Sequence, residues 1–243
     1  WSPKLGLLYQ LNEDHQVYLN ISRGFRAPQA TELYRLQREQ VVADLDSESL
    51  DSIELGFRGG SAAVNYEFVV YWMNRKNIIF RDSDFYNVAN GATDHAGVEL
   101  ALSYALTDTV DVGVSASYAE HNYDDDRALN GVEIDGNRVD SAPTHFGSVR
   151  LGWDFSEQGR AELEWLNQGA YYTDPENLHR YDGHDLLNLR TRLKLSERWS
   201  VSARLSNLTN KDYAERADFS GFAGDRYFPG ESRALHMGIA VDY

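Results

Sequence analysis

The sequence contains no cysteine, only five prolines and no long run of apolar residues. Without cysteine, neither a disulfide framework nor a thiolate metal site is available. Although 42% of the residues are hydrophobic, no segment approaches the roughly 20 consecutive apolar residues that a membrane-spanning helix needs. These absences exclude a helical membrane protein and a disulfide-rich scaffold.

Positive charge is also scarce, since 23 Lys and Arg residues face 38 Asp and Glu residues and leave a net charge of −15. Nucleic-acid binding requires a basic footprint, so no nucleic-acid partner is expected. The seven histidines are dispersed, and no nucleophile–base–acid set is recognisable. His179 and His184 flank one loop, but that spacing is not a specific metal signal. We therefore expect no enzyme, no cofactor and no metal centre.

What the sequence does contain is period-2 alternation from end to end, which is typical of strands with one apolar face. Val64 and Phe68, for example, alternate with Asn65 and Glu67. About eleven such strands are predicted, near 1–11, 16–26, 50–58, 63–73, 92–106, 110–121, 144–155, 160–172, 184–195, 199–206 and 232–243. Most approach the roughly 9–11 residues that cross a bilayer as a tilted strand.

The predicted connections alternate in length. Short polar turns are expected at 12–15, 59–62, 107–109, 156–159 and 196–198, and long connections at 27–49, 74–91, 122–143, 173–183 and 207–231. An outer-membrane barrel has this alternation because its periplasmic turns lie at one rim and its extracellular loops at the other. A soluble sandwich has no reason to keep its long loops at one end.

The two faces of each strand differ in the same consistent way. Apolar side chains expected to face lipid are Val64, Phe68, Leu100, Leu102, Leu189, Leu193, Met237 and Ile239. Charged side chains expected to face the lumen are Glu99, Asp111, Arg190, Arg192 and Arg204. A soluble one-sided sheet is the alternative, but about eleven strands would then need a covering layer, for which no segment is left. The predicted fold class is therefore all-β, a transmembrane antiparallel β-barrel fragment.

Several short segments carry a family resemblance, and they follow one another in the family's order. They are Ser22-Arg-Gly-Phe-Arg-Ala-Pro28, Glu32-Leu-Tyr34, Leu50-Asp-Ser-Ile-Glu-Leu-Gly-Phe-Arg58, Arg138-Val-Asp-Ser-Ala-Pro143, Leu205-Ser-Asn-Leu-Thr-Asn-Lys-Asp-Tyr213 and Tyr227-Phe-Pro-Gly230. Together with an aromatic C-terminal residue, this set resembles the TonB-dependent outer-membrane receptors. Such receptors are 22-stranded barrels whose lumen is closed by an N-terminal plug.

The resemblance implies what the chain is part of and what it does. A complete bacterial barrel has an even number of strands, so we expect residues 1–243 to be the C-terminal half of the barrel, without the plug and the N-terminal strands. The implied function is active uptake across the bacterial outer membrane of a scarce, bulky nutrient, most often a ferric siderophore. The implied partners are that chelate, the TonB complex through the missing N-terminal region, the barrel-assembly machinery and outer-membrane lipid. A passive porin is the alternative.

Two sets of residues are candidates for function. Long connections rich in Arg and Tyr could hold a polar, partly anionic chelate by stacking and charge-assisted hydrogen bonds, and the candidates there are Arg26, Tyr34, Arg38, Tyr86, Tyr172 and Tyr227. Arg26 has a second interpretation, in which it fixes the geometry where a strand breaks into a loop. Haem is not favoured, because haem receptors of this family carry a histidine where residues 29–49 have none. The C-terminal alternation of Met237, Ile239, Val241 and Tyr243 resembles the barrel-assembly signal.

Overall fold

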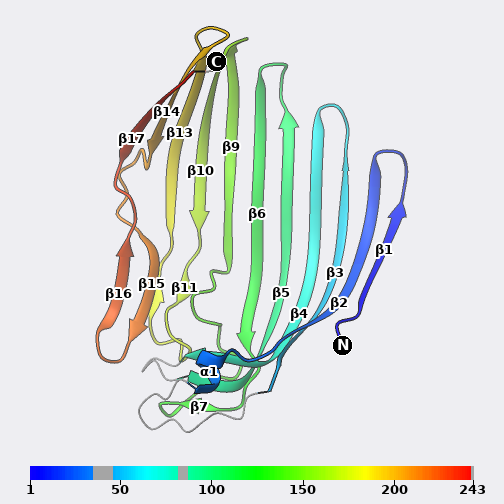
Figure 1. Cartoon of the computed structure of the whole chain (residues 1–243), viewed down its shortest axis with the longest axis vertical. Helices are drawn as coiled ribbons and strands as arrows, with labels where there is room; N and C mark the ends of the chain where they lie inside the picture. The colour runs from blue at the N-terminus through cyan, green and yellow to red at the C-terminus, as the bar shows by residue number, and fades with distance from the viewer. Residues whose placement is uncertain (35–45, 82–86, 242–243) are drawn as a thin grey trace.

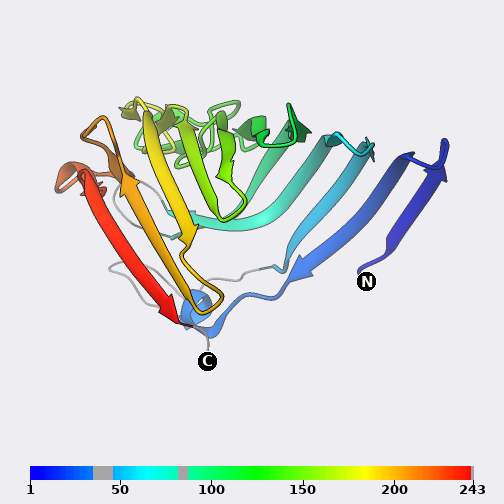
Figure 2. The ribbon, with the colours of Figure 1, turned by 90° about the horizontal axis from the view of Figure 1, so that it is seen from above.

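The computed structural model describes residues 1–34, 46–81 and 87–241. One antiparallel sheet of eleven strands dominates it, in the order β1-β2-β3-β4-β5-β6-β9-β10-β13-β14-β17. The strands are β1 (Lys4–Gln10), β2 (His15–Arg26), β3 (Glu48–Gly60), β4 (Val64–Arg81), β5 (Asn87–Ala105), β6 (Val110–Tyr123), β9 (His145–Ser156), β10 (Gly159–Gln168), β13 (His184–Lys194), β14 (Trp199–Ser206) and β17 (Ala234–Val241). The sheet is a single curved wall with β1 and β17 at its two edges (Figures 1 and 2).

The short and long connections lie at opposite rims of the wall, as the sequence predicts (Figure 1). In their described parts, the long connections carry three small hairpins and one short helix. These are β7 (Ala128–Leu129) with β8 (Val132–Glu133), β11 (Tyr171–Tyr172) with β12 (Arg180–Tyr181), β15 (Ala214–Ser220) with β16 (Gly224–Pro229), and α1 (Ala30–Tyr34). No helix in the described ranges is long and apolar enough to cross a membrane.

Strand register gives the sheet one apolar face and one polar face, because directly paired residues point to the same side. One apolar row runs through eight strands as Val64, Tyr104, Val112, Leu151, Leu163, Leu189, Leu205 and Leu235. A polar row runs through six strands as Asp111, Gly152, Glu162, Arg190, Arg204 and His236. The side chains predicted to face lipid all lie on the apolar face, and those predicted to face the lumen all lie on the polar face. This follows because side chains two residues apart on a strand point to the same face.

The strand ends differ from prediction most clearly in the second long connection. The sequence predicts a loop over 74–91, whereas β4 continues to Arg81 and β5 begins at Asn87. The β4–β5 register shifts between Lys76 and Ile78 and again between Ile78 and Phe80, and Asn77 has φ 59°. Such irregularities interrupt the period-2 pattern, so the pattern alone could not extend the two strands. The predicted strand 160–172 similarly ends at Gln168 and resumes as the separate β11.

Candidate functional site

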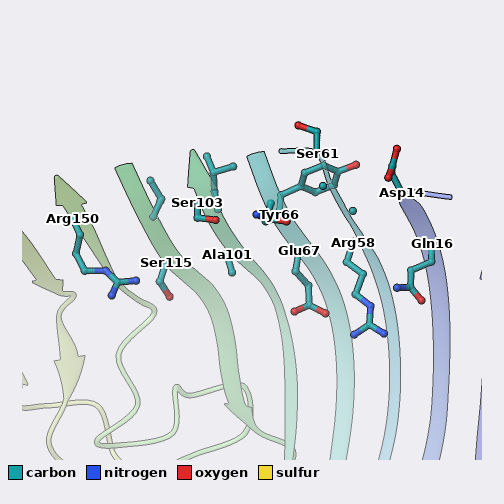
Figure 3. A pocket seen from close by; sticks show the side chains of 15 residues that line it. Asp14, Gln16, Arg58, Ser61, Tyr66, Glu67, Ala101, Ser103, Ser115 and Arg150 are labelled. Carbon is teal, nitrogen blue, oxygen red and sulfur yellow. The ribbon is translucent and has the colours of Figure 1, made fainter. Parts of the chain in front are cut away.

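The polar face is hollowed near the rim of short turns. A cavity of about 820 Å³ opens there, with polar lining side chains Asp14, Gln16, Arg58, Glu67, Ser103, Ser115 and Arg150. Figure 3 shows these side chains on one side of the sheet, Asp14 from the turn between β1 and β2 and the others from neighbouring strands. Arg150 makes no ion pair with any residue that the structure describes. A charged wall of this kind requires water or a polar partner in front of it.

Tyrosine rings on this face lie against glycines of the neighbouring strand. A Cβ atom on Gly56 would overlap the Tyr18 ring, and one on Gly97 would lie 2.6 Å from the Tyr71 hydroxyl. Only glycine leaves room for so close an approach. The Tyr18 hydroxyl donates to Glu67 at 3.1 Å, so the ring is fixed along the wall.

Charged side chains further along the polar face form two cross-strand networks. Arg160 donates to Asp111 at 2.6 Å and to Asp154 at 3.2 Å. Arg190 donates to Glu162 at 3.2 Å and to Glu164 at 2.8 Å. Each pair is partly exposed and stabilises the sheet only modestly. In these two networks, arginines of the polar face are matched with carboxylates on nearby strands.

Arg26, a candidate ligand contact from the sequence, is held by two carboxylates. Its guanidinium donates to Glu48 at 2.9 Å and to Glu32 at 3.0 Å. Glu32 also accepts from the backbone N–H of Gln29 at 2.6 Å. The hydrogen bond from Arg26 lowers the pKa of Glu32. Arg26 therefore ties the start of the first long connection, including α1, to the first residue of β3, which is the loop-geometry role.

A second cavity, of about 460 Å³, opens beside this anchor at the rim of long connections. It is lined by Gly24, Phe25, Arg26, Glu48, Ser49, Leu50, Met73, Arg75 and His95. Arg75 Nη2 lies 3.5 Å from Glu48 Oε2, and the Arg75 side chain keeps 44% of its surface exposed. Arg75 is not among the candidates from the sequence, because the predicted strand ends at residue 73. The strand in fact continues and places Arg75 on the polar face.

The fourth and fifth long connections pack together. Tyr171, Tyr181, Ala214 and Ala217 form a buried cluster, and the Tyr181 hydroxyl accepts from the Ala214 N–H at 3.1 Å. Tyr172 is half-buried within β11, and Tyr227 is exposed on β16 with its ring 6.3 Å from that of Tyr181. The structure thus brings Tyr172 and Tyr227 into one loop assembly, apart from Arg26.

The third long connection joins the same assembly through Asn177. The Asn177 side chain accepts from the Arg138 N–H and donates to the Arg138 carbonyl, both at 2.8 Å. Asp140 accepts from the Tyr123 hydroxyl at 2.7 Å, and burial raises the pKa of the Asp140 carboxyl. Three of the five long connections therefore form one packed body over one part of the wall.

Asn207 and Asn210, in the run Asn-Leu-Thr-Asn, organise the exit from β14. Asn207 donates to the Lys211 carbonyl and accepts from the Lys211 N–H, both at 2.8 Å. Asn210 accepts from the Arg233 N–H at 3.1 Å. Both asparagines have positive φ, 49° and 51°, a conformation that asparagine tolerates in turns.

The remaining candidates are placed only in part. Tyr34 ends α1, while Arg38, Tyr86 and Tyr243 lie outside the described residues. Met237 and Ile239 are 80% and 71% exposed on the apolar face of β17. Val241 shares their parity on that strand.

Comparison with known proteins identifies the class of protein to which this curved sheet belongs. The family model for the TonB dependent receptor-like β-barrel matches residues 1–208. The chain belongs to that family, and its place is the bacterial outer membrane. The apolar face of the sheet is therefore the lipid face, and the polar face lines the lumen.

Particular relatives are similar at low identity. The metal-pseudopaline receptor CntO of Pseudomonas aeruginosa is 21% identical over 259 residues, covering 100% of this chain and 33% of the relative. The ferric yersiniabactin uptake receptor FyuA of Yersinia pestis superposes with a TM-score of 0.81 at 18% identity, over 99% of this chain and 37% of FyuA. The ferric citrate transporter FecA gives 0.83 at 20% identity, over 98% of this chain and 38% of FecA. The chain thus spans about a third of the length of its curated relative.

Proposed function

We propose that residues 1–243 form the C-terminal half of a 22-stranded barrel, and that the whole receptor takes up a ferric siderophore or a similar metal chelate. The proposed energy source is the TonB complex, acting through an N-terminal region with a plug. The observation that carries the proposal is the family match over residues 1–208 to a sheet of eleven strands with all its long connections at one rim. The named relatives are receptors and transporters of metal chelates.

The proposed ligand contacts lie at the rim of long connections. They comprise the residues suggested by the sequence, Arg26, Tyr34, Arg38, Tyr86, Tyr172 and Tyr227, with Arg75 added from the second cavity. Arg75 and Arg38 are the proposed contacts for anionic groups of the chelate. A hydrogen bond to a charged group contributes roughly 1.5–3 kcal/mol, so removing either guanidinium should weaken binding by about one to two decades.

Uptake of radiolabelled iron by cells that carry the full-length receptor tests the proposal. A panel of ferric hydroxamate, catecholate and carboxylate chelates is presented with and without a functional TonB complex. We expect uptake of at least one chelate, dependent on both the receptor and TonB, and reduced by Arg75→Ala or Tyr227→Ala. Arg198→Ala, in a short turn at the opposite rim, is the matched control. Receptor-dependent uptake that persists without TonB would instead support a passive channel.

A further inference from the structure

Three side chains of the polar face lie in one register row near the rim of long connections. Met73 of β4 pairs with His95 of β5, and His95 pairs with His121 of β6. Cross-strand partners of this kind keep their Cβ atoms about 4.5–5.5 Å apart on the same face. All three side chains are half-buried. The row therefore places one thioether and two imidazoles side by side on the lumen wall.

The two imidazoles already face one another through their Nδ1 atoms. His95 Nδ1 and His121 Nδ1 are 2.7 Å apart, with ring centroids 4.9 Å apart. A hydrogen bond between two such nitrogens needs one neutral ring that accepts and one ring that donates. His95 Nε2 lies 2.9 Å from Thr93 Oγ1. If Nε2–H donates a hydrogen bond to this hydroxyl, His95 Nδ1 carries no proton and accepts from His121 Nδ1–H. Within the described residues, Nε2 of His121 makes no hydrogen bond.

This geometry is close to that of a metal site. Metal–imidazole bonds of about 2.0 Å in a trigonal or tetrahedral site hold two nitrogens about 3.3–3.5 Å apart. The imidazole pair would have to open by less than about 1 Å to admit an ion. The His121 proton would move from Nδ1 to the unbonded Nε2, so both Nδ1 lone pairs become available without net proton release. The contact between His95 and Thr93 would persist and orient the ligand from behind.

The third donor selects the kind of ion. In the described part of the chain, no three His, Cys, Asp or Glu side chains gather to hold a metal ion, so the third donor here is sulfur. Met73 and His95 both line the cavity of about 460 Å³. Thioethers favour soft ions such as Cu(I), whereas imidazoles suit several first-row metals. Arg75 lines the same cavity and disfavours a dication more than a monocation.

We propose that Met73, His95 and His121 form a copper(I) site on the lumen wall of the barrel. The site takes the bare ion through two imidazole nitrogens and one thioether sulfur, at the edge of the second cavity, which Met73 and His95 line. It is a second binding activity beside the proposed uptake of metal chelates and does not depend on it.

Titration of the full-length receptor in detergent with Cu(I), under anaerobic reducing conditions and against a chromogenic Cu(I) chelator, tests the site. We expect His95→Ala with His121→Ala to remove one equivalent of bound Cu(I). Met73→Leu should weaken Cu(I) binding by about tenfold or more and leave Zn(II) binding unchanged, because the thioether favours the soft ion. His236→Ala, a polar-face histidine of β17 bonded to Glu231 at 3.1 Å, should bind Cu(I) like the unaltered receptor.

Folding is followed by the gel-mobility shift of heated and unheated barrels, and His95→Gln replaces His95→Ala if the alanine variant fails to fold. Equal Cu(I) stoichiometry and affinity in the unaltered receptor and the double variant would overturn the site. Loss of Cu(I) and Zn(II) binding together in Met73→Leu would overturn the role of the thioether. Ferric chelate uptake is measured on the same variants: failure of every chelate in the unaltered receptor refutes the proposed function and leaves the copper result standing.

Discussion

The hydroxyl of Tyr171 accepts a hydrogen bond of 2.8 Å from the backbone N–H of Ala217, a residue 46 positions further along the chain. This bond joins the fourth and fifth long connections inside their buried cluster. Since the N–H is buried, removing its acceptor leaves it unsatisfied at a cost of about 1–3 kcal/mol. The packing of the fourth and fifth long connections therefore depends in part on the Tyr171 hydroxyl.

We expect Tyr171→Phe to loosen this contact without unfolding the barrel. Hydrogen exchange of the Ala217 amide should accelerate by about one to two decades. Tyr172→Phe is the control, because within the described residues the Tyr172 hydroxyl makes no hydrogen bond. Equal protection of the Ala217 amide in both variants would contradict the role given to Tyr171.

Acidification should strengthen the third connection through Asp140. Burial raises the pKa of this carboxyl above 3.8, so the folded connection favours the protonated form. The resulting stability is complete below the ordinary pKa and is lost as pH rises through the raised one. Asp140→Asn removes the buried charge but keeps an oxygen that can accept from Tyr123.

Hydrogen exchange within residues 124–144, followed from about pH 4 to pH 7, measures this effect. Asp140→Asn should be at least as protected as the unaltered chain at neutral pH and should lose part of the pH dependence. Asp126→Asn, an exposed neighbour, should keep it. Weaker protection of Asp140→Asn at neutral pH would show that the carboxylate charge stabilises the connection, against our expectation.

The first connection should respond to pH in the opposite direction. The pKa of Glu32 is lowered by its hydrogen bond from Arg26, so the stability from this pair is present above the ordinary pKa and is lost as pH falls through the lowered one. Arg26→Ala should remove the anchor, and because the pair is partly exposed the loss should be under about 1 kcal/mol.

Limited proteolysis within residues 27–47 reads out the anchor. We expect faster cleavage of Arg26→Ala than of Arg23→Ala, whose ion pair with Asp51 is long at 3.6 Å and exposed. Identical cleavage rates would mean that the Arg26 network does not hold the segment.

The assignment of the two faces can be tested at neighbouring positions. Leu102 lies on the apolar face and Ser103 on the polar face of β5. Leu102→Lys places a charge on the lipid face three residues before the end of β5, so it should cost less than the about 2–4 kcal/mol expected at the bilayer midplane. It should still cost more than Ser103→Lys, which faces the lumen. Refolding of the full-length receptor into lipid vesicles across a denaturant series gives both values. Equal costs for the two substitutions would contradict the assignment of the two faces.

The strands and their facing could be predicted because both follow from period-2 alternation, as the rows through Leu189 and Arg190 illustrate. The ends of β4 and β5 could not, because a bulge beside Asn77 hides the pattern. The sequence indicated that Arg26 could fix the geometry of the strand exit, but it did not indicate the partner. Glu48 is 22 residues away, and no local pattern links the two residues. The His95–His121 pair was missed for the same reason, since only the register of β5 against β6 brings the two rings together.

The glycines beneath Tyr18 and Tyr71 also affect the bore of the barrel. A tyrosine that stands up from a strand narrows a lumen by the length of its ring, whereas one lying across a glycine narrows it only by the thickness of the ring. Gly56 and Gly97 therefore keep the passage beside β2–β5 wide while the wall still offers aromatic surface. A methyl group at either position would crowd the neighbouring phenol and push it away from the wall into the lumen. The absence of a side chain at Gly56 and at Gly97 therefore determines how far Tyr18 and Tyr71 protrude.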